Sequence, residues 1–295
     1  MKKSTLLFAA LAFASLTMAQ KATPDSLAGW KTGGVISLNA SQVSLTNWAA
    51  GGENSLSGIG LVNLYANYKK NKFAWDNTLD LAYGLIKQGE DPVIKSDDKI
   101  DFASKAGQYA FKNWYYTGLV GFRSQFAPGY ATPGDEAYTS NFLAPAYLNV
   151  SLGMDYKPSE NFTLFISPVT GKTTFVRDDS LSAEGAFGVD PGKQIRPEFG
   201  GYVKMVFKHD IMKNVSFQTK LDLFSNYLNN PENIDVNWDV LIAMKINEYL
   251  SANLTTNLIY DDDILIAFEQ EDGSVKKRPA IQFKEMFSVG LSYKF

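Results

Sequence analysis

The side chain with the widest chemical range in this sequence is its single histidine, His209, which lies between Lys208 and Asp210. A histidine acts as a general base when a serine nucleophile and an orienting asparagine or carboxylate accompany it. No such serine and asparagine motif stands beside His209, and one histidine without any cysteine does not make a zinc site. We therefore expect a polar residue at the rim of the fold, with no catalytic residue and no metal, and a hydrolase is only a remote alternative.

A second motif, Thr170-Gly171-Lys172-Thr173, ends like a phosphate-binding loop. Such a loop also needs a glycine at the position that Ile166 occupies, and a helix after it that this sequence does not predict. The sequence therefore predicts no nucleotide and no other cofactor.

Acidic residues gather in four segments that we expect to be loops: Asp97-Asp98, Asp178-Asp179, Asp261-Asp262-Asp263 and 269–272. Carboxylates are the usual ligands of calcium, but the spacing does not match a calcium-binding EF-hand loop. We interpret these groups as solvated loop charge. Weak bridging by divalent cations to the phosphates of lipopolysaccharide is a second interpretation.

The segment 47–55 is the best candidate for a functional loop, because connecting segments often carry function and its glycines allow backbone angles that other residues avoid. Trp48 either folds into the mouth of the fold or binds a partner, or it belongs to an ordinary bend within an aromatic belt. Both interpretations remain open. The candidate residues are Asn47, Trp48, Gly51, Gly52, Glu53 and Asn54.

The elements that position these groups are strands. In the segment 281–295, apolar residues alternate with polar or small ones up to the terminal Phe295, and 234–246 and 250–260 repeat the pattern. Alternation with a period of two places the two sets on opposite faces of a strand. Strands of soluble proteins usually have about 5–6 residues, so this length favours tilted strands that cross a membrane.

Short and long connections alternate along the chain. Tight turns are expected at 70–71, 112–113, 158–161, 213–214 and 247–249, and longer polar loops near 43–54, 88–98, 128–143, 168–196, 226–233 and 261–279. An even strand number with this alternation is typical of an outer-membrane barrel with short periplasmic turns and long extracellular loops. We predict an all-β, antiparallel up-and-down barrel of about twelve strands. The strands are expected at 32–42, 55–69, 72–87, 99–111, 113–127, 144–157, 161–167, 197–208, 214–225, 234–247, 250–260 and 280–295. Pro168 ends the seventh strand early in this prediction.

The first residues differ from the rest. Lys2 and Lys3 precede an apolar run that is too short for a spanning helix, and Thr17-Met18-Ala19 supplies the small residues of a cleavage site. We predict a cleaved signal peptide over 1–19 and a barrel domain over 20–295, with 20–31 as a periplasmic segment. A net charge of −3 gives no indication of a nucleic-acid partner.

Two resemblances support export to an outer membrane. The terminal strand resembles the signature that the barrel-assembly machinery reads, with Val289, Leu291, Tyr293 and Phe295 on one face. The segment 45–55, with the sequence LTNWAAGGENS, and the Trp75-Asp76-Asn77 that follows a later turn resemble an uncharacterised barrel family of the Bacteroidota, a domain of unknown function. The resemblance implies fold and location, with the lipid bilayer and lipopolysaccharide as surroundings, and no activity.

Alternation also predicts which charges face the lumen. They are Asp76, Asp80, Arg123, Asp155, Lys204, Lys220, Asp222, Asp239 and Lys245. Buried charges must pair or remain hydrated. Hydrated charges of both signs would line a small, weakly selective pore, which makes a diffusion channel or transporter the first hypothesis. Pairs across the lumen would close it, which makes a structural or partner-binding barrel of an envelope complex the alternative.

Overall fold

The computed structural model describes residues 29–46, 50, 53–270 and 274–295. Twelve strands form one closed antiparallel barrel, as predicted. They are β1 (Gly29–Val43), β2 (Ser55–Lys70), β3 (Phe73–Gln88), β4 (Ile94–Phe111), β5 (Trp114–Ser124), β8 (Ala146–Ser159), β9 (Phe162–Phe175), β10 (Ile195–Met212), β11 (Val215–Asn226), β12 (Ile234–Lys245), β13 (Leu250–Tyr260) and β16 (Gln282–Lys294). Each strand pairs with the next barrel strand along the chain, and the pairing of β1 with β16 closes the ring. The predicted signal peptide and residues 20–28 lie outside the described residues, whereas residues 29–31 belong to β1 instead of preceding it.

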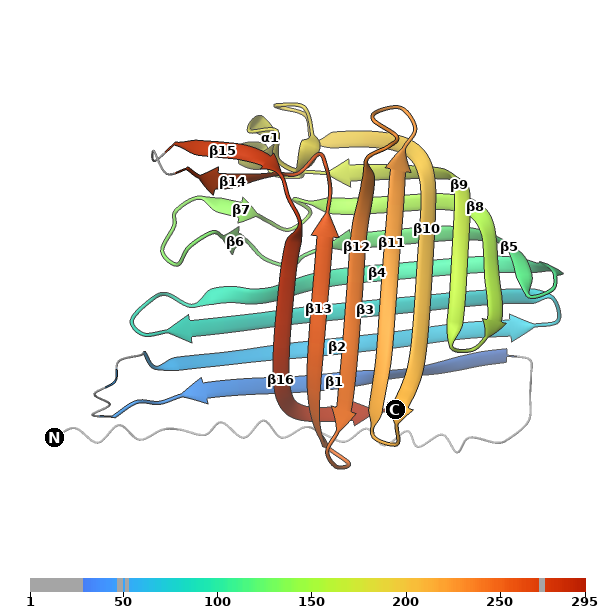
Figure 1. Cartoon of the computed structure of the whole chain (residues 1–295), viewed down its shortest axis with the longest axis horizontal. Coiled ribbons are helices and arrows are strands. Elements are labelled where there is room, and N and C mark those ends of the chain that lie inside the picture. The colour runs from blue at the N-terminus through green and yellow to red at the C-terminus, as the bar shows by residue number, and fades with distance from the viewer. Residues whose placement is uncertain (1–28, 47–49, 51–52, 271–273) are drawn as a thin grey trace.

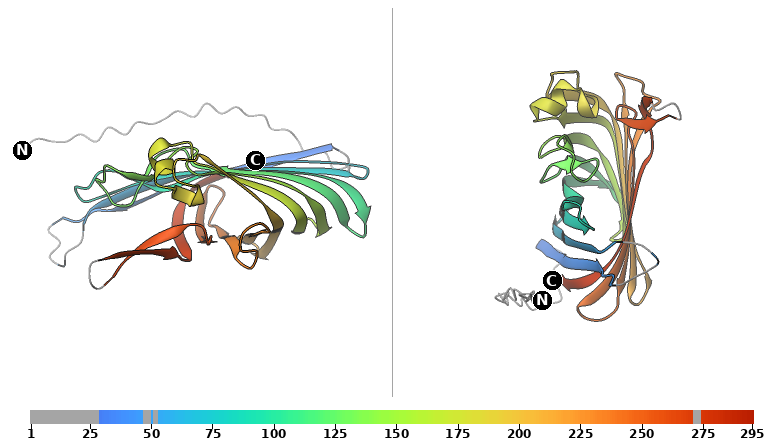
Figure 2. Two further views of the ribbon diagram at one scale, coloured as in Figure 1. Left: turned by 90° about the horizontal axis from the view of Figure 1, so that it is seen from above. Right: turned by 90° about the vertical axis from the view of Figure 1, so that its left-hand side faces the viewer.

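The strands are strongly tilted. In Figure 1 the front strands β10 to β13 run almost at right angles to the rear strands β1 to β4, as expected for two walls of one tilted barrel. Figure 2 shows that these walls face each other across a flattened section. The long connections gather at one end (upper left in Figure 1), called here the long-loop end, and the tight turns lie at the opposite, short-turn end.

The tight turns lie where the sequence predicts them. Asn71, Lys112 and Asn113 have positive φ angles of 54°, 41° and 70°, a conformation that asparagine adopts more readily than most residues. These turns fix the register of the hairpins β2–β3 and β4–β5. Each hairpin therefore holds its polar residues on the lumen face.

The predicted seventh strand is too short, because β9 continues through Pro168 to Phe175. The register shifts beside this proline on both sides, between Leu152 and Met154 of β8 and between Gly200 and Tyr202 of β10. A bulge at this point places the missing N–H of Pro168 where the hydrogen-bond ladder is already interrupted. Thr170 to Thr173 are thus strand residues instead of loop residues.

The long connections contain short elements that the sequence did not predict. Two small hairpins, β6 (Gly129–Tyr130) with β7 (Tyr138–Ser140) and β14 (Leu265–Glu269) with β15 (Val275–Pro279), rise at the long-loop end. The helix α1 (Asp179–Ala183) and a 3₁₀ turn (Ala186–Gly188) lie between β9 and β10. Within the described residues, no helix has the length and apolarity needed to cross a membrane.

A small apolar core packs under α1. It consists of Ala144, Val176, Leu181 and Val189, which are all buried. Tyr138 and Phe187 pack against it and join the β6–β7 hairpin to the α1 segment. The long connections therefore form a packed layer over this end of the barrel.

Candidate functional site

The lumen holds three clusters of charged side chains that alternate strand positions direct inward. We name them by their height above the short turns. The lower cluster contains Asp76, Lys105, Asp155 and Lys157. The middle cluster contains Asp80, Lys99, Asp101, Arg123, Lys204, Lys220, Asp222 and Asp239. The upper cluster contains Lys172, Arg196, Glu198, Asp235, Asp261 and Asp263.

In the lower cluster, two lysines share one buried aspartate. The Asp155 Oδ2 atom lies 2.6 Å from the Lys105 Nζ atom and 3.3 Å from the Lys157 Nζ atom, and the Asp155 side chain is 0% exposed. Lys157 also pairs with Asp76 of β3. Each lysine thus has a carboxylate partner, which a buried charge requires.

The middle cluster joins opposite walls of the barrel. Lys220 of β11 pairs with Asp80 of β3, and the Lys99 Nζ atom of β4 lies 3.3 Å from Asp239 Oδ2 of β12. In each pair the two strands lie six places apart in the ring of twelve, so the contact spans the lumen.

Arg123 connects the remaining members of the middle cluster. Its Nη2 atom lies 3.1 Å from Asp101 Oδ2 and 3.4 Å from Asp222 Oδ2. Asp222 also receives hydrogen bonds from Lys204 at 2.8 Å and from the Tyr202 hydroxyl at 2.5 Å. The cluster contains four cations and four carboxylates and is electrically balanced.

The upper cluster has fewer cations than carboxylates. The Lys172 Nζ atom lies 2.6 Å from Asp235, 3.5 Å from Glu198 and 3.7 Å from Asp261. Arg196 pairs with Glu198 at 3.1 Å and with Asp263. Two cations therefore serve four carboxylates. Among the described residues, the acidic side chains do not converge as metal ligands do.

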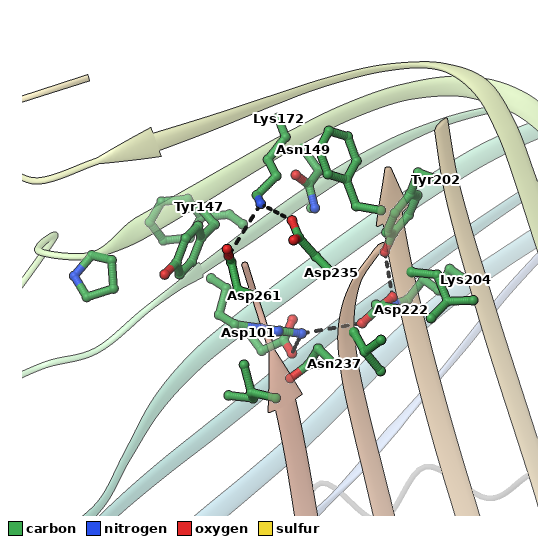
Figure 3. Close-up of a pocket in the computed structure, with 18 of the residues that line it drawn as sticks. Asp101, Tyr147, Asn149, Lys172, Tyr202, Lys204, Asp222, Asp235, Asn237 and Asp261 are labelled. Atoms are coloured by element: carbon green, nitrogen blue, oxygen red, sulfur yellow. Dashed lines mark hydrogen bonds and ion pairs between the residues drawn. The ribbon is translucent and has the colours of Figure 1, made fainter. Parts of the chain in front are cut away.

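A cavity of about 390 Å³ lies in the lumen between the middle and upper clusters. Figure 3 shows Lys172 and Asp235 on one side of it and Asp222 and Asp101 on the other. Its wall also contains aromatic and amide side chains, namely Tyr147, Phe187, Tyr202, Phe224, Tyr260, Asn149 and Asn237. It is therefore a mixed apolar and polar chamber on the side of the long loops.

The structure brings together eight of the nine lumen residues predicted from alternation, in the lower and middle clusters. The ninth, Lys245, is exposed at the short-turn end of β12 and belongs to no cluster. Alternation could also have found Lys105 and Asp101, which share an inward register with other lumen residues of β4. Lys172 was missed because the predicted strand stopped at Pro168.

Three of the four acidic segments are wrongly interpreted as solvated loop charge, whereas 269–272 lies partly outside the described residues. Asp97 lies in β4 and pairs with Lys284 at 2.6 Å, and Asp98 accepts hydrogen bonds from the backbone of Phe126 and Ala127. Asp261 and Asp263 belong to the upper cluster. These carboxylates hold neighbouring segments together because each one satisfies a specific donor.

Asp178 caps the helix α1. Burial of its carboxyl opposes ionisation, but hydrogen bonds from the Asn141 side chain, the Leu181 backbone N–H and the Tyr138 hydroxyl outweigh this and hold its pKa below the usual range. The same hydrogen bond raises the pKa of Tyr138. One carboxylate thus links α1 to the β6–β7 hairpin.

The other predicted sites are outside these clusters. His209 is exposed near the short-turn end of β10, and the centroid of its ring lies 6.0 Å from that of Phe207.

Of the candidate loop, four residues lie outside the described residues, namely Asn47, Trp48, Gly51 and Gly52. Glu53 and Asn54 are described, and Asn54 accepts hydrogen bonds from the backbone N–H groups of Leu45 and Gly89. Asn54 thus fastens the base of this loop to the next one.

Residues 40–130 match the model of a family described as a protein of unknown function, DUF3078. This match confirms a resemblance to a domain of unknown function, whereas the Bacteroidota origin and the role of the LTNWAAGGENS motif stay predictions. No curated protein matches the chain.

Solved structures also resemble the chain at low identity. The COG4313 outer membrane channel from Pseudomonas putida F1 has a TM-score of 0.39 at 11% identity, covering 93% of this chain and 99% of that one. The translocator domain of the autotransporter NalP from Neisseria meningitidis has a TM-score of 0.36 at 8% identity, covering 90% and 88%. The outer membrane channel DcaP of Acinetobacter baumannii has a TM-score of 0.31 at 9% identity, covering 92% and 96%.

Proposed function

We propose that this protein is a β-barrel of a Gram-negative outer membrane, and that ion pairs close its lumen to ions in the resting state. The outer wall supports the membrane location. Leu38, Val150, Phe283 and Phe287 are exposed on it, although they are large and apolar. Lipid is the environment in which such a surface is stable.

Aromatic side chains occur near both edges of this apolar wall. Exposed aromatics near the short turns include Trp30, Tyr116 and Tyr293, and those near the long loops include Tyr83, Phe126, Tyr227 and Trp238. Two such belts are expected where a barrel meets the two interfaces of a bilayer. The short turns then face the periplasm and the long loops the exterior. A signal peptide at 1–19 and the terminal Phe295 complete an export route through the barrel-assembly machinery.

The observation that carries the closed lumen is the contact between opposite walls in the middle cluster. Lys220 with Asp80, and Lys99 with Asp239, each connect strands that face each other across the barrel. A hydrated ion needs an open column of water, and these side chains occupy its path. A closed barrel of this kind fits a structural or partner-binding role in the envelope.

A narrow channel is the second candidate, favoured by one observation. Charged pairs cross the lumen beside a small apolar cluster of Leu119, Phe165, Tyr202 and Phe224. Pairs of long side chains separate more easily than an apolar core, and salt weakens those that water reaches. Such a lumen opens when its pairs rearrange.

Planar-bilayer recording separates the two candidates. The purified chain, with its fold verified by heat-modifiable migration, is expected to give no discrete current steps across a range of moderate voltages. Reproducible steps in the unmodified protein would contradict the resting closure and favour the channel. In that case Arg123→Ala is expected to shift ion selectivity towards cations, because it removes a positive charge from the middle cluster.

A further inference from the structure

The cavity between the middle and upper clusters has the features of a ligand site. Its volume of about 390 Å³ falls within the range of about 300–1,000 Å³ that small-molecule sites occupy. Residues of the long connections, including Gln125, Ser140, Phe187 and Ile264, contribute to its wall. The cavity therefore lies on the long-loop side of the lumen, from which we expect a ligand to enter, and the middle cluster forms its floor.

The charges on the wall of the cavity are already engaged with each other. Arg123 is held by Asp101 and Asp222, and Lys172 by Asp235. An anionic ligand would have to take Arg123 or Lys172 from its carboxylates and leave a buried charge without its partner, which is costly. The wall consequently disfavours an anionic ligand.

Three polar atoms of residues on the wall, two of them from neutral amides, lack partners. Asn149 Oδ1, Asn237 Nδ2 and the Nε atom of Arg123 are buried and make no hydrogen bond to the described part of the chain. Unsatisfied buried polar groups are uncommon and point to a missing partner. Asn149 Oδ1 offers an acceptor and Asn237 Nδ2 offers a donor, while Asn237 Oδ1 already accepts from Asn257 Nδ2 at 3.2 Å. An unpartnered acceptor and donor match hydroxyl groups, because a hydroxyl both donates and accepts.

Aromatic rings supply the rest of the wall. Tyr147, Phe187 and Tyr260 line the cavity together with the buried Tyr202 and Phe224, and Figure 3 shows Tyr147 and Tyr202 on opposite sides of it. Aromatic faces pack well against flat apolar surfaces. A sugar ring combines such a surface, formed by its C–H groups, with hydroxyl groups around its edge.

We propose that this cavity binds a neutral mono- or disaccharide, with Asn149 and Asn237 hydrogen-bonded to its hydroxyl groups and the aromatic rings against its C–H face. The site does not depend on whether the lumen conducts ions. Silence or current in a bilayer therefore tests the proposed closure and leaves this proposal unaffected, whereas sugar binding tests only the cavity.

Two glycines of β5 provide matched variants. A Cβ atom at Gly121 would lie 3.7 Å from Leu119 Cδ2 and 3.8 Å from Asn149 Cβ, both ordinary contacts, and Gly121 lines the cavity. A Cβ atom at Gly118 would lie 3.6 Å from Leu152 Cδ2 on the outer wall. Gly121→Leu thus fills the cavity without backbone strain, and Gly118→Leu makes the same change on the opposite face of the strand.

Saturation-transfer NMR on the full chain in lauryldimethylamine oxide, a detergent without sugar, tests the proposal. The probes are glucose, galactose, N-acetylglucosamine and maltose, with glucuronate as an anionic analogue of glucose. We expect signal transfer to at least one neutral probe. The signal should disappear in Gly121→Leu, persist in Gly118→Leu and weaken about tenfold in affinity in Asn149→Leu.

Three outcomes would overturn the proposal. One is no transfer to any neutral probe from protein with verified barrel fold, and another is transfer that persists in Gly121→Leu. The third is equal binding of glucuronate and glucose, which would show that the paired charges do not exclude an anionic ligand. Asn253→Leu, a buried amide of β13 outside the cavity, controls for general effects of losing an amide from the lumen.

Discussion

The lower and upper halves of the lumen contain the same kinds of charged side chain, but the ratio of cations to carboxylates differs between them. In the lower and middle clusters each cation has a carboxylate, and in the middle cluster the side chains meet across the barrel. In the upper cluster two cations serve four carboxylates, and a cavity lies beneath them. The lumen is thus filled where cations and carboxylates balance, and it contains the cavity where carboxylates are in excess.

The difference has a physical basis. Buried charges remain ionised only when opposite charges and hydrogen bonds compensate their loss of water. In the lower cluster Asp155 is inaccessible to solvent and is compensated by Lys105 and Lys157, although its Oδ1 atom has no hydrogen-bond partner among the described residues. In the upper cluster Glu198 is 2% exposed, whereas Asp263 is 30% exposed. Solvent thus reaches Asp263, while Lys172 and Arg196 compensate Glu198.

The largest expected effect is the loss of Asp155. In Asp155→Ala, Lys105 keeps no carboxylate within its cluster and Lys157 keeps only Asp76. Breaking a buried ion pair in this way costs about 3–5 kcal/mol. Urea unfolding of the chain in lipid vesicles measures the free energy of unfolding. Asp263→Ala is the control from the upper cluster and should cost less, and equal losses would show that the two halves are not different.

The next effect concerns the contact between opposite walls. Asp80→Ala leaves Lys220 unpaired at the middle of the lumen, so we expect lower stability and the appearance of current steps in a planar bilayer. Asp80→Ala combined with Lys220→Ala removes both charges and should recover part of the stability, with a coupling energy of about 0.5–3 kcal/mol. Additive losses in this cycle would mean that the pair does not join the walls.

Much of this arrangement could be predicted from alternation. The inward positions of Asp76, Asp80 and Asp222 follow from the period of a strand, because its two faces are distinct in sequence. Pairing partners could not be predicted, since Lys220 and Asp80 are far apart in the chain and meet only after the barrel closes. Closure depends on strand number and stagger, which one strand does not reveal.

Two local features explain where the sequence-based predictions are wrong. Proline lacks a backbone N–H donor, so the sequence predicts that the seventh strand ends at Pro168. In the structure a bulge on both sides of β9 accommodates this proline. The sequence-based prediction therefore omits Lys172, and with it the upper cluster. The interpretation of Asp178 as solvated loop charge is wrong because its partners, Tyr138 and Asn141, come from another loop and cannot be inferred from the sequence around it. Contacts between long loops leave no periodic signal in the sequence.

A smaller effect is expected from reducing the charge imbalance of the upper cluster. Asp261→Asn removes a carboxylate whose distance to Lys172 is 3.7 Å and keeps the oxygen that accepts from the Asp263 backbone. Lys172 retains Asp235 at 2.6 Å. We expect a change within about 1 kcal/mol, neutral or stabilising, in the same urea assay. Asp235→Asn is the contrast and should destabilise, and the reverse order would contradict the assignment of Asp235 as the main partner.

The smallest effect concerns the loop layer above the cavity and depends on pH. Because the pKa of Asp178 is held below its usual value in the folded chain, its contribution is fully present above the unfolded pKa of about 3.9. It is lost as the pH falls through the lower, folded value. Amide exchange in 176–194, corrected for intrinsic rates, should therefore accelerate in acid, and Asp178→Asn should show faster exchange already at neutral pH. Equal exchange in both proteins at neutral pH would mean that α1 is held by its apolar contacts alone, whereas exchange confined to this loop layer would show that the barrel beneath it keeps its ion pairs independently.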